Sequence, residues 1–300
     1  MREIELNIHS KEEAEAYVLA CEETFSRDLD EAIEDVFAAP DVKTVALAGP
    51  TCSGKTTTAG KLTERIIRHG QNAVVLSIDD FFRNRQDRNN VEGEAPDYDS
   101  VDAIDLDCLS RFMTRLNAGV PVLVPHYSFE VTSRVGYEEY RPDEKDIYVF
   151  EGIQAVYPEV TSQFGAGYRS IFISVMSDVS YRGSVLTKHD ERLLRRLVRD
   201  YKFRGATAEF TLFLWHGVRD NEEKNIYPNA KNCDVYINSY LPYEPFVLAH
   251  HALPILESVP KDSDWRDEAE ELIERLRAFD CPYFEDRMIP AHSVFREFIG

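Results

Sequence analysis

Residues 44–57, TVALAGPTCSGKTT, decide the fold that we expect of this chain. They open with a continuous apolar run of strand length, which is typical of a strand buried on both faces of a parallel sheet. Residues 49–56 then match the pattern G-x-x-x-x-G-K-[ST], and a helical pattern follows to about His69. A glycine-rich turn between a strand and a helix directs backbone N–H groups inward, and the helix N-terminus adds its positive dipole. The stretch therefore predicts a phosphate-binding loop.

The side chains of this loop have predictable roles toward a nucleotide. Lys55 is expected to hold the β and γ phosphates, and the hydroxyl of Thr56 is expected to bind Mg²⁺. ATP and Mg²⁺ are therefore the expected cofactors. We interpret Cys52 as a filler of the loop, although a helix N-terminus can also activate a thiol as a redox switch. The residues expected to contact the nucleotide are Gly49, Thr51, Cys52, Ser53, Gly54, Lys55, Thr56 and Thr57.

Four further buried runs extend this unit to a doubly wound parallel sheet of the α/β class. Helical segments lie between most of them. The runs are AVVLSI at 73–78, IYVFEG at 147–152, SIFISV at 170–175 and VYINS at 235–239. With the phosphate-binding loop, this order of elements predicts a P-loop NTPase fold like that of nucleoside monophosphate kinases.

The chain divides into three expected parts. Residues 1–40 predict a short strand at 3–9 and then a helix, which begins with a capping box of Ser10 and Glu13 and stops at Ala39-Pro40. Residues 41–258 are expected to form the P-loop domain, and residues 259–300 a C-terminal helix and tail. Within the domain, the polar insertion 83–145 is rich in Tyr and Pro and is expected to bind the substrate, because long insertions often carry binding.

The composition narrows the expected partners and location. The 54 acidic residues outnumber the 34 basic ones, and a net charge of −20 would repel a nucleic acid backbone. No segment approaches the roughly 18 apolar residues of a membrane span, and the N-terminus lacks the apolar stretch of a secretion signal. The five cysteines include no C-x-x-C pair. We therefore expect a cytoplasmic protein that acts on a small molecule, without a nucleic acid or membrane partner; whether it forms a homo-oligomer stays open.

Carboxylates at two strand ends are the candidates for catalysis. In open α/β sheets the ligand lies beyond the carboxyl ends of the strands, where Asp79-Asp80 and Glu151 follow buried runs. Transfer of a phosphoryl group to an alcohol needs one carboxylate to accept the hydroxyl proton and another beside the metal. Asp79 suits the first role and Glu151 the second. Asp80 is equally well explained as the N-cap of the next segment.

A basic segment, residues 188–206, interrupts the acidic chain. Arg192, Arg195, Arg196 and Arg199 follow the spacing i, i+3, i+4 and i+7, which places four guanidinium groups on one helical face. Guanidinium groups bind phosphate oxygens in pairs, so this segment predicts a lid over the triphosphate. The alternative is an ion-paired surface helix.

Together these stretches resemble the uridine kinase and phosphoribulokinase family of P-loop kinases, from about Thr44 to Asn238. The resemblance rests on GPTCSGKTT, SIDDFF, DYDSVDAID, VPHYSF and YVFEGI in that order, and RRLVRDYKFRG is similar to the family's lid. It implies an ATP-dependent kinase that phosphorylates a hydroxyl group, with the 5′-hydroxyl of uridine or cytidine as the acceptor. The segments LWHGVRDNEEKNIYPNA and SVFREFIG are closer to a longer bacterial subgroup.

The resemblance also implies roles for individual residues. Asp79 becomes the general base and Glu151 the carboxylate on the metal side. The acceptor contacts become Asp79, Phe82, Asp99, Tyr127, Phe129 and Arg204, with Asp99 on the ribose hydroxyls and Tyr127 on the base. Arg196, Arg199 and Arg204 become lid contacts, of which Arg199 and Arg204 join Lys55 among the catalytic residues.

Departures from the family pattern keep alternatives open. Thr132 stands where uridine-cytidine kinases have a His that reads the pyrimidine, and Ala206 stands where an Arg often follows the R-G pair. The acceptor could therefore be a sugar phosphate, a pantothenate-like alcohol or a polyol. A GTPase switch is a weaker alternative, based on residues 187–190, TKHD, which fit the guanine-reading pattern [NT]-K-x-D. A nucleotide-binding regulator without turnover would not need Asp79. The residues that could complete the acceptor site are Trp215, His216, Arg219 and Lys224.

Overall fold

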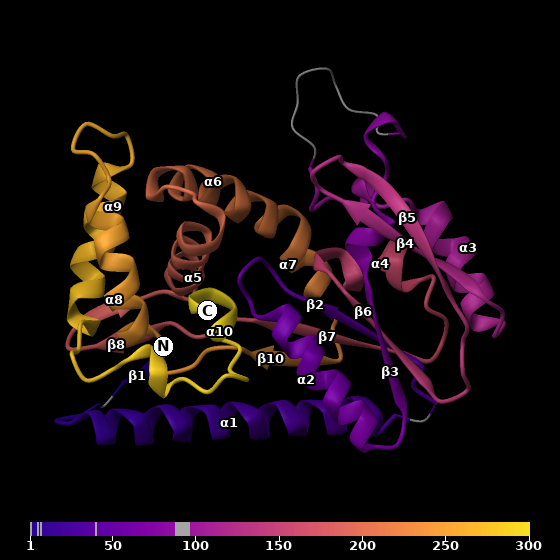
Figure 1. Cartoon of the computed structure of the whole chain (residues 1–300), viewed down its shortest axis with the longest axis horizontal. Coiled ribbons are helices and arrows are strands. Elements are labelled where there is room, and N and C mark those ends of the chain that lie inside the picture. Colours follow the sequence, from indigo (N-terminus) through magenta and orange to yellow (C-terminus); the bar gives the residue numbers. More distant parts are fainter. Residues whose placement is uncertain (1, 5, 7, 40, 88–96) are drawn as a thin grey trace.

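Five strands of the described chain form one parallel sheet (Figure 1). The computed structural model describes residues 2–4, 6, 8–39, 41–87 and 97–300. In spatial order the strands are β10 (Val235–Asn238), β7 (Tyr168–Ser174), β2 (Thr44–Ala48), β6 (Asp146–Glu151) and β3 (Asn72–Ser77). This order confirms the expected doubly wound sheet. Because β2 is central, the loop that follows it opens at the middle of the carboxyl edge.

The central strands β2, β6 and most of β7 are buried on both faces, whereas the edge strands β3 and β10 are partly exposed. Successive residues of β2 alternate between two cores. Val45 and Leu47 belong to one core, whereas Ala46 and Ala48 belong to the other. The first core is covered by α1 (Lys11–Phe37), α2 (Lys55–Arg68), α5 (Lys188–Arg204), α8 (Glu244–Glu257) and α9 (Arg266–Leu276). The second is covered by α3 (Leu106–Asn117) and α4 (Pro158–Thr161). Burial on both faces explains why the central strands read as continuous apolar runs.

The other elements extend this framework. The insertion carries α3 and an antiparallel hairpin of β4 (Val122–Ser128) and β5 (Ser133–Tyr140). A small sheet joins β1 (Arg2–Glu3), β8 (Val179–Tyr181) and β9 (Ser184–Leu186). The remaining α-helices are α6 (Ala208–Asn221), α7 (Tyr227–Ala230) and α10 (Arg296–Ile299). The short turns of helix are η1 (Ile78–Phe81), η2 (Arg85–Asp87), η3 (Val101–Ala103), η4 (Ile153–Val156), the π-helical η5 (Glu222–Ile226), η6 (Arg277–Phe279) and η7 (Asp286–Met288).

The N-terminal elements differ in detail from the prediction. The strand is shorter than the expected 3–9, since β1 ends at Glu3. Ser10 caps α1, because its Oγ accepts a hydrogen bond from the Glu13 N–H at 3.2 Å. The Glu13 carboxylate accepts from the His9 N–H and not from Ser10, so only half of the capping box forms. The helix ends at Phe37, close to the predicted stop, although Pro40 itself lies outside the described residues.

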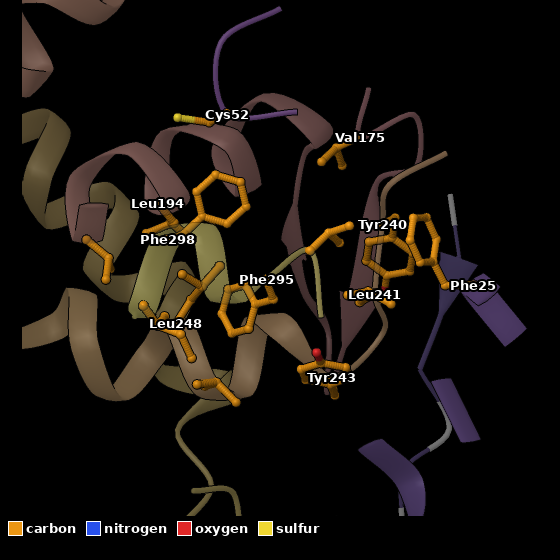
Figure 2. Packing of buried hydrophobic residues seen from close by; sticks show 14 of the residues in the cluster. Phe25, Cys52, Val175, Leu194, Tyr240, Leu241, Tyr243, Leu248, Phe295 and Phe298 are labelled. Atoms are coloured by element: carbon orange, nitrogen blue, oxygen red, sulfur yellow. The ribbon is translucent and has the colours of Figure 1, made fainter. Parts of the chain in front are cut away.

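The C-terminal tail packs into the same core as the sheet. Figure 2 shows Phe295 and Phe298 from this tail among Leu194, Tyr243 and Leu248. Residues of α1, which runs along one side of the molecule in Figure 1, belong to this core as well. The first and last parts of the chain are therefore packed against the central part. Within the described ranges, no helix combines the length and apolar character that crossing a membrane requires.

Candidate active site

The loop between β2 and α2 is built around two glycines. A Cβ atom on Gly49 would lie 2.1 Å from the carbonyl oxygen of Ile173 and 2.7 Å from Ser53 Oγ, so only glycine fits there. Gly54 is the N-cap of α2 and has φ +87°, a left-handed conformation that favours glycine. These two positions let the backbone turn back over the N-terminus of α2, as the motif predicts.

The polar groups of this loop fit a phosphate ligand. Ser53 is buried, yet its hydroxyl has no hydrogen-bond partner among the described residues. The Lys55 ammonium donates to the carbonyl oxygen of Pro50 at 3.1 Å, within its own loop. A buried hydroxyl and an ammonium group beside a helix N-terminus are donors suited to an anion. Thr56 is exposed at the start of α2, where its hydroxyl could join a metal ion to a phosphate.

Asp79 and Glu151 come together at the carboxyl edge of two neighbouring strands. Glu151 is the last residue of β6 and is paired with Ser77, the last residue of β3. Asp79 lies two residues after Ser77, in η1. A Cβ on Gly152 would lie 2.9 Å from the Ile78 Cβ and 3.7 Å from Asp79 Oδ1. The absence of a side chain at Gly152 therefore lets the turn after β6 approach the turn after β3 closely. Among the described residues, no three His, Cys, Asp or Glu side chains form a ready-made metal cluster, and Mg²⁺ commonly binds through one or two carboxylates together with phosphates.

The environment of Asp79 changes its proton affinity. Burial raises the pKa of Asp79 to about 6, and the negative charge of Glu151 adds to this effect, whereas Lys55 acts in the opposite direction. Burial, followed by the charge of Asp97, raises the pKa of Asp99 to about 6 as well. A carboxylate with a raised pKa is a stronger base while it remains ionised at neutral pH.

Asp99 is held by residues that the sequence did not single out. The Tyr157 hydroxyl donates to the carbonyl oxygen of Asp99 at 2.9 Å, and the Gln154 side-chain amide donates to the carbonyl oxygen of Tyr98. Both donors lie in or just after η4, directly beyond Glu151. Gln154 is fully buried, and a Gln within an apolar segment was the only sequence signal for it.

Aromatic residues of the insertion gather around Phe82, three residues after Asp79. Phe82, Tyr98, Tyr127 and Phe129 form a cluster in which neighbouring ring centroids lie 5.3–5.8 Å apart. The Tyr127 N–H donates to Asp80 Oδ1 at 2.8 Å, at an irregularity of β4. Asp80 thus fixes the hairpin to the carboxyl edge instead of capping a helix. The structure brings together Phe82, Tyr127 and Phe129, as a shared acceptor contact requires.

Two of the four arginines expected on one lid face are buried ion pairs. Arg192 pairs with Glu222, and Arg195 pairs with Glu244 at 2.7 Å, and all four side chains are essentially inaccessible to solvent. The spacing correctly placed them on one face, but that face meets other elements of the protein. The prediction that they cover a triphosphate is therefore wrong for these two residues.

The remaining arginines of α5 converge on one carboxylate. Asp200 pairs with Arg196 at 3.3 Å, Arg199 at 2.8 Å and Arg204 at 3.3 Å. The positive charge of Arg196 acts to lower the pKa of Asp99, against the effect of burial. Arg196 is therefore close enough to Asp99 to interact with it electrostatically. Arg204 keeps 60% of its side chain exposed at the end of α5. These three groups stay candidates for phosphate contacts.

The candidate acceptor residues of α6, the helix after α5, are engaged by other residues of the protein. The Arg192 guanidinium lies over the ring of Trp215, 5.4 Å from its centroid, and Trp215 is buried. His216 pairs with Glu268 at 3.0 Å on the outer side of α6. Arg219 binds Glu222 and Glu223. Because these partners hold Trp215, His216 and Arg219, the structure does not support their proposed role in completing the acceptor site.

Residues 187–190 form a helix cap and do not present a guanine-reading site. The Thr187 hydroxyl accepts from the Asp190 N–H, and the Asp190 carboxylate accepts from the Thr187 N–H at 2.8 Å. This reciprocal pair is the capping box of α5. The Asp190 carboxylate, which would bind guanine in a GTPase, also pairs with Arg275 at 3.3 Å.

Comparison with known proteins assigns the family. The model of the "Phosphoribulokinase / Uridine kinase family" matches residues 44–242, from β2 to just beyond β10. The chain belongs to the phosphoribulokinase and uridine kinase family. Members of this family are phosphotransferases that act on a hydroxyl group, so the protein is a kinase of this type.

Individual curated relatives match about two thirds of the chain. The uridine kinase of Staphylococcus epidermidis is 30% identical over 194 residues, covering 64% of this chain and 86% of the relative. Uridine-cytidine kinase B of Dictyostelium discoideum is 27% identical over 196 residues, covering 64% and 73%. A solved structure of a possible uridine kinase from Bacillus stearothermophilus covers 49% of this chain and 79% of its own at 19% identity, with a TM-score of 0.41.

Proposed function

We propose that this family member transfers the γ-phosphoryl group of ATP to a hydroxyl group of a small molecule, and that its acceptor is a nucleoside, uridine or cytidine. The proposal rests on one arrangement: the charge of Lys55 acts on the carboxylates of both Asp79 and Asp99, whose pKa values burial raises to about 6. Phe82 and Tyr98, which lie close to these two residues in the chain, belong to one aromatic cluster. A nucleoside offers that arrangement a hydroxyl to activate, a ribose diol to bind and a flat base to pack.

Each residue then has a chemical task. Lys55 and the backbone of the loop hold the β and γ phosphates, with Arg196, Arg199 and Arg204 as further phosphate contacts. Thr56 and Glu151 hold Mg²⁺, whose charge neutralises the developing charge on the phosphate oxygens. Asp79 accepts the proton of the acceptor hydroxyl. The hydroxyl oxygen bonds to the γ phosphorus, the bond from that phosphorus to the β–γ bridging oxygen breaks, and ADP leaves.

The acceptor contacts follow from the insertion. Asp99 accepts hydrogen bonds from the ribose hydroxyls, since an ionised carboxylate is an acceptor for neutral hydroxyl donors. Tyr127, Phe129 and Phe82 pack against the base. The relatives named as uridine and uridine-cytidine kinases support this choice of acceptor, whereas Thr132 and Ala206 are the positions at which this chain departs from their pattern.

A panel of acceptors tests the proposal. The purified full chain is incubated with Mg-ATP and each of uridine, cytidine, other nucleosides, pantothenate, ribulose 5-phosphate and polyols. ADP release is measured, and the product mass is checked for one added phosphoryl group. We expect turnover with uridine or cytidine above all other acceptors. Turnover with only a non-nucleoside alcohol would agree with Asp79 as the base but would overturn the assignment of a nucleoside as the acceptor. ADP release without any acceptor would favour an ATPase or a switch.

A further inference from the structure

Arg195 of α5 connects the phosphate-binding loop to Ser239, which follows β10, and to Glu244 at the start of α8. Its Nη1 donates to the carbonyl oxygen of Cys52 at 3.1 Å and to Ser239 Oγ at 3.3 Å, and its Nη2 donates to the Ser239 carbonyl oxygen at 2.7 Å. Its Nε and Nη2 also donate to the Glu244 carboxylate at 2.8 and 2.7 Å. The five N–H groups of a guanidinium therefore match five acceptors within the protein.

The contact with Cys52 lies at the most constrained peptide of the loop. Cys52 is buried and has φ +58°, a left-handed conformation that is uncommon for a residue with a side chain. The surroundings must hold such a residue in place, because isolated chains seldom adopt this conformation. Arg195 supplies a charged, buried donor to the carbonyl of this residue.

The C-terminal segment Ser293–Gly300 adds a second set of contacts to the same loop. The Thr57 hydroxyl in the first turn of α2 donates to Glu297 Oε2 at 3.2 Å. The side chain of Val294 lies 3.5 Å from the position that a Cβ on Gly54 would occupy. The Phe298 ring lies 4.9 Å from the Arg195 guanidinium, in cation–π contact. Figure 2 shows Phe298 beside Leu194 of α5 and near Cys52.

This segment is itself fixed at both ends of α10. The Lys202 ammonium of α5 donates to the carbonyl oxygen of Ile299 at 2.8 Å. Ser293 and Tyr243 share a hydrogen bond between their hydroxyl groups at 3.2 Å. The segment is thus held against α5 and against Tyr243, the N-cap of α8, and its Glu297 reaches the first turn of α2.

We propose that Arg195 and the segment Ser293–Gly300 form a clamp that holds the phosphate-binding loop in the shape that binds the nucleotide. The inference rests on the proposed ATP-dependent function and assigns the C-terminal segment to the nucleotide half of the site. Arg195 acts through the Cys52 peptide and Glu297 acts through the Thr57 hydroxyl, so both are positioning residues. The acceptor half, around Asp99 and Tyr127, is built from other elements.

Glu297 gives the first test. Binding of Mg-ATP and Mg-ADP to the full chain is measured by titration calorimetry, together with kcat and the KM of each substrate. We expect Glu297→Ala to weaken Mg-ATP binding about threefold to tenfold, the range expected for one lost hydrogen bond, with the acceptor KM unchanged. Glu297→Gln keeps an acceptor oxygen and should stay within about twofold of the wild type. Glu285→Gln, which removes the charge that, among the described residues, pairs with Lys11 and Arg287 and not with residues 49–57, is the matched control.

Arg195 gives the second test. Arg195→Lys keeps the charge but loses the planar fork. Arg192→Lys makes the same change in an equally buried ion pair whose hydrogen bond, among the described residues, goes to Glu222 and not to the Cys52 carbonyl. We expect both variants to lower the melting temperature and only Arg195→Lys to weaken Mg-ATP binding, by about tenfold or more. A general loss of stability would affect both variants alike, and equal nucleotide binding in the two would refute the positioning role of Arg195.

The remaining outcomes separate the clamp from the proposed function. If wild-type protein binds Mg-ATP and Glu297→Ala binds it equally well, the clamp is wrong while the kinase assignment stands. If both Glu297 variants bind Mg-ATP more tightly, Glu297 repels the phosphates instead of positioning the loop, which also overturns the clamp. A wild-type protein that binds no nucleotide would overturn the proposed function itself, and the clamp with it.

Discussion

Asp79 shows how position determines the chemistry of a single carboxyl group. Its neighbour Asp80 has the same side chain, but Asp80 accepts a backbone hydrogen bond from Tyr127 and holds the hairpin. Asp79 is instead half-buried beside Glu151 and Lys55, where burial raises its pKa to about 6. One residue of the pair therefore becomes a structural acceptor and the other a candidate base.

Replacement of this base should slow turnover strongly with little effect on nucleotide binding. We expect Asp79→Asn to reduce kcat by about a hundredfold or more, the loss typical of a removed general base, with Mg-ATP affinity nearly unchanged. In the wild type, kcat/KM should rise as pH increases through about 6, because the base acts only when ionised. Initial rates from pH 5 to 9 provide the check, and a flat profile over this range would argue against Asp79.

The same replacement should stabilise the protein above pH 6. The pKa of Asp79 rises from an ordinary 3.8 to about 6 in the folded protein, so the folded state binds this proton more tightly than the unfolded state does. Stability is therefore lost as pH rises from about 4 to 6. We expect Asp79→Asn to gain about 3 kcal/mol over the wild type at pH 7.5 and little at pH 4. Urea unfolding at both pH values measures the difference, and the same gain at pH 4 would exclude the linkage.

At the scale of elements, α5 serves different purposes along its length. Its first turn is a capping box, its middle buries two ion-paired arginines, and its last turn gathers three arginines around Asp200. Removing an arginine from water is unfavourable unless an opposite charge lies beside it in the core. Glu222 and Glu244 supply that charge and are themselves buried. The helix therefore connects the core to the phosphate-binding loop instead of lying freely over it.

The capping box of α5 leads to a prediction about both the stability of the protein and its preference for ATP over GTP. Thr187→Ala removes the hydroxyl that accepts from the Asp190 N–H, and should cost about 1 kcal/mol of stability. If residues 187–190 act only as a cap, the preference for ATP over GTP should not change. Thermal unfolding and competition between the two nucleotides test both points. A shift of preference toward or away from GTP in this variant would revive the guanine-reading interpretation.

At the scale of the whole molecule, α1 and the C-terminal tail share one core with the sheet. Leu29 of α1 and Phe298 of α10 are fully buried in the same cluster as Val45 and Leu47 of β2. Residues from the two ends of the chain thus cover the face of the sheet that carries α2. The three expected parts, divided after residues 40 and 258, therefore share one hydrophobic core.

A substitution in α1 tests this continuity. Leu29→Ala deletes a fully buried side chain and should destabilise the whole protein by about 2–4 kcal/mol, because the lost contacts lie in the common core. Unfolding should remain a single transition in both circular dichroism and Trp fluorescence. Leu19→Ala, on the exposed side of the same helix, should cost little. Separate melting of a helical segment in the Leu29 variant would indicate that α1 is an independent unit.

The sequence alone determined the sheet, the phosphate-binding loop and the two carboxylates at its edge. These features depend on short segments, since a strand buried on both faces must read as an apolar run and a P-loop must place glycines at fixed positions. The predicted runs at 73–78 and 147–152 correspond to β3 and β6. The loops that follow them then lie at one edge, because parallel strands point the same way.

Only the tertiary structure decided which polar side chains are free to act. The arginine spacing in α5 revealed a common face, but Glu222 and Glu244, 30 and 49 residues further along, determine that Arg192 and Arg195 are buried there. Likewise, Tyr157 holds the backbone of Asp99 from 58 residues away, and Glu297 reaches Thr57 across 240 residues. Helical periodicity specifies which side chains share a face; the partners that meet that face come from the folding of distant segments.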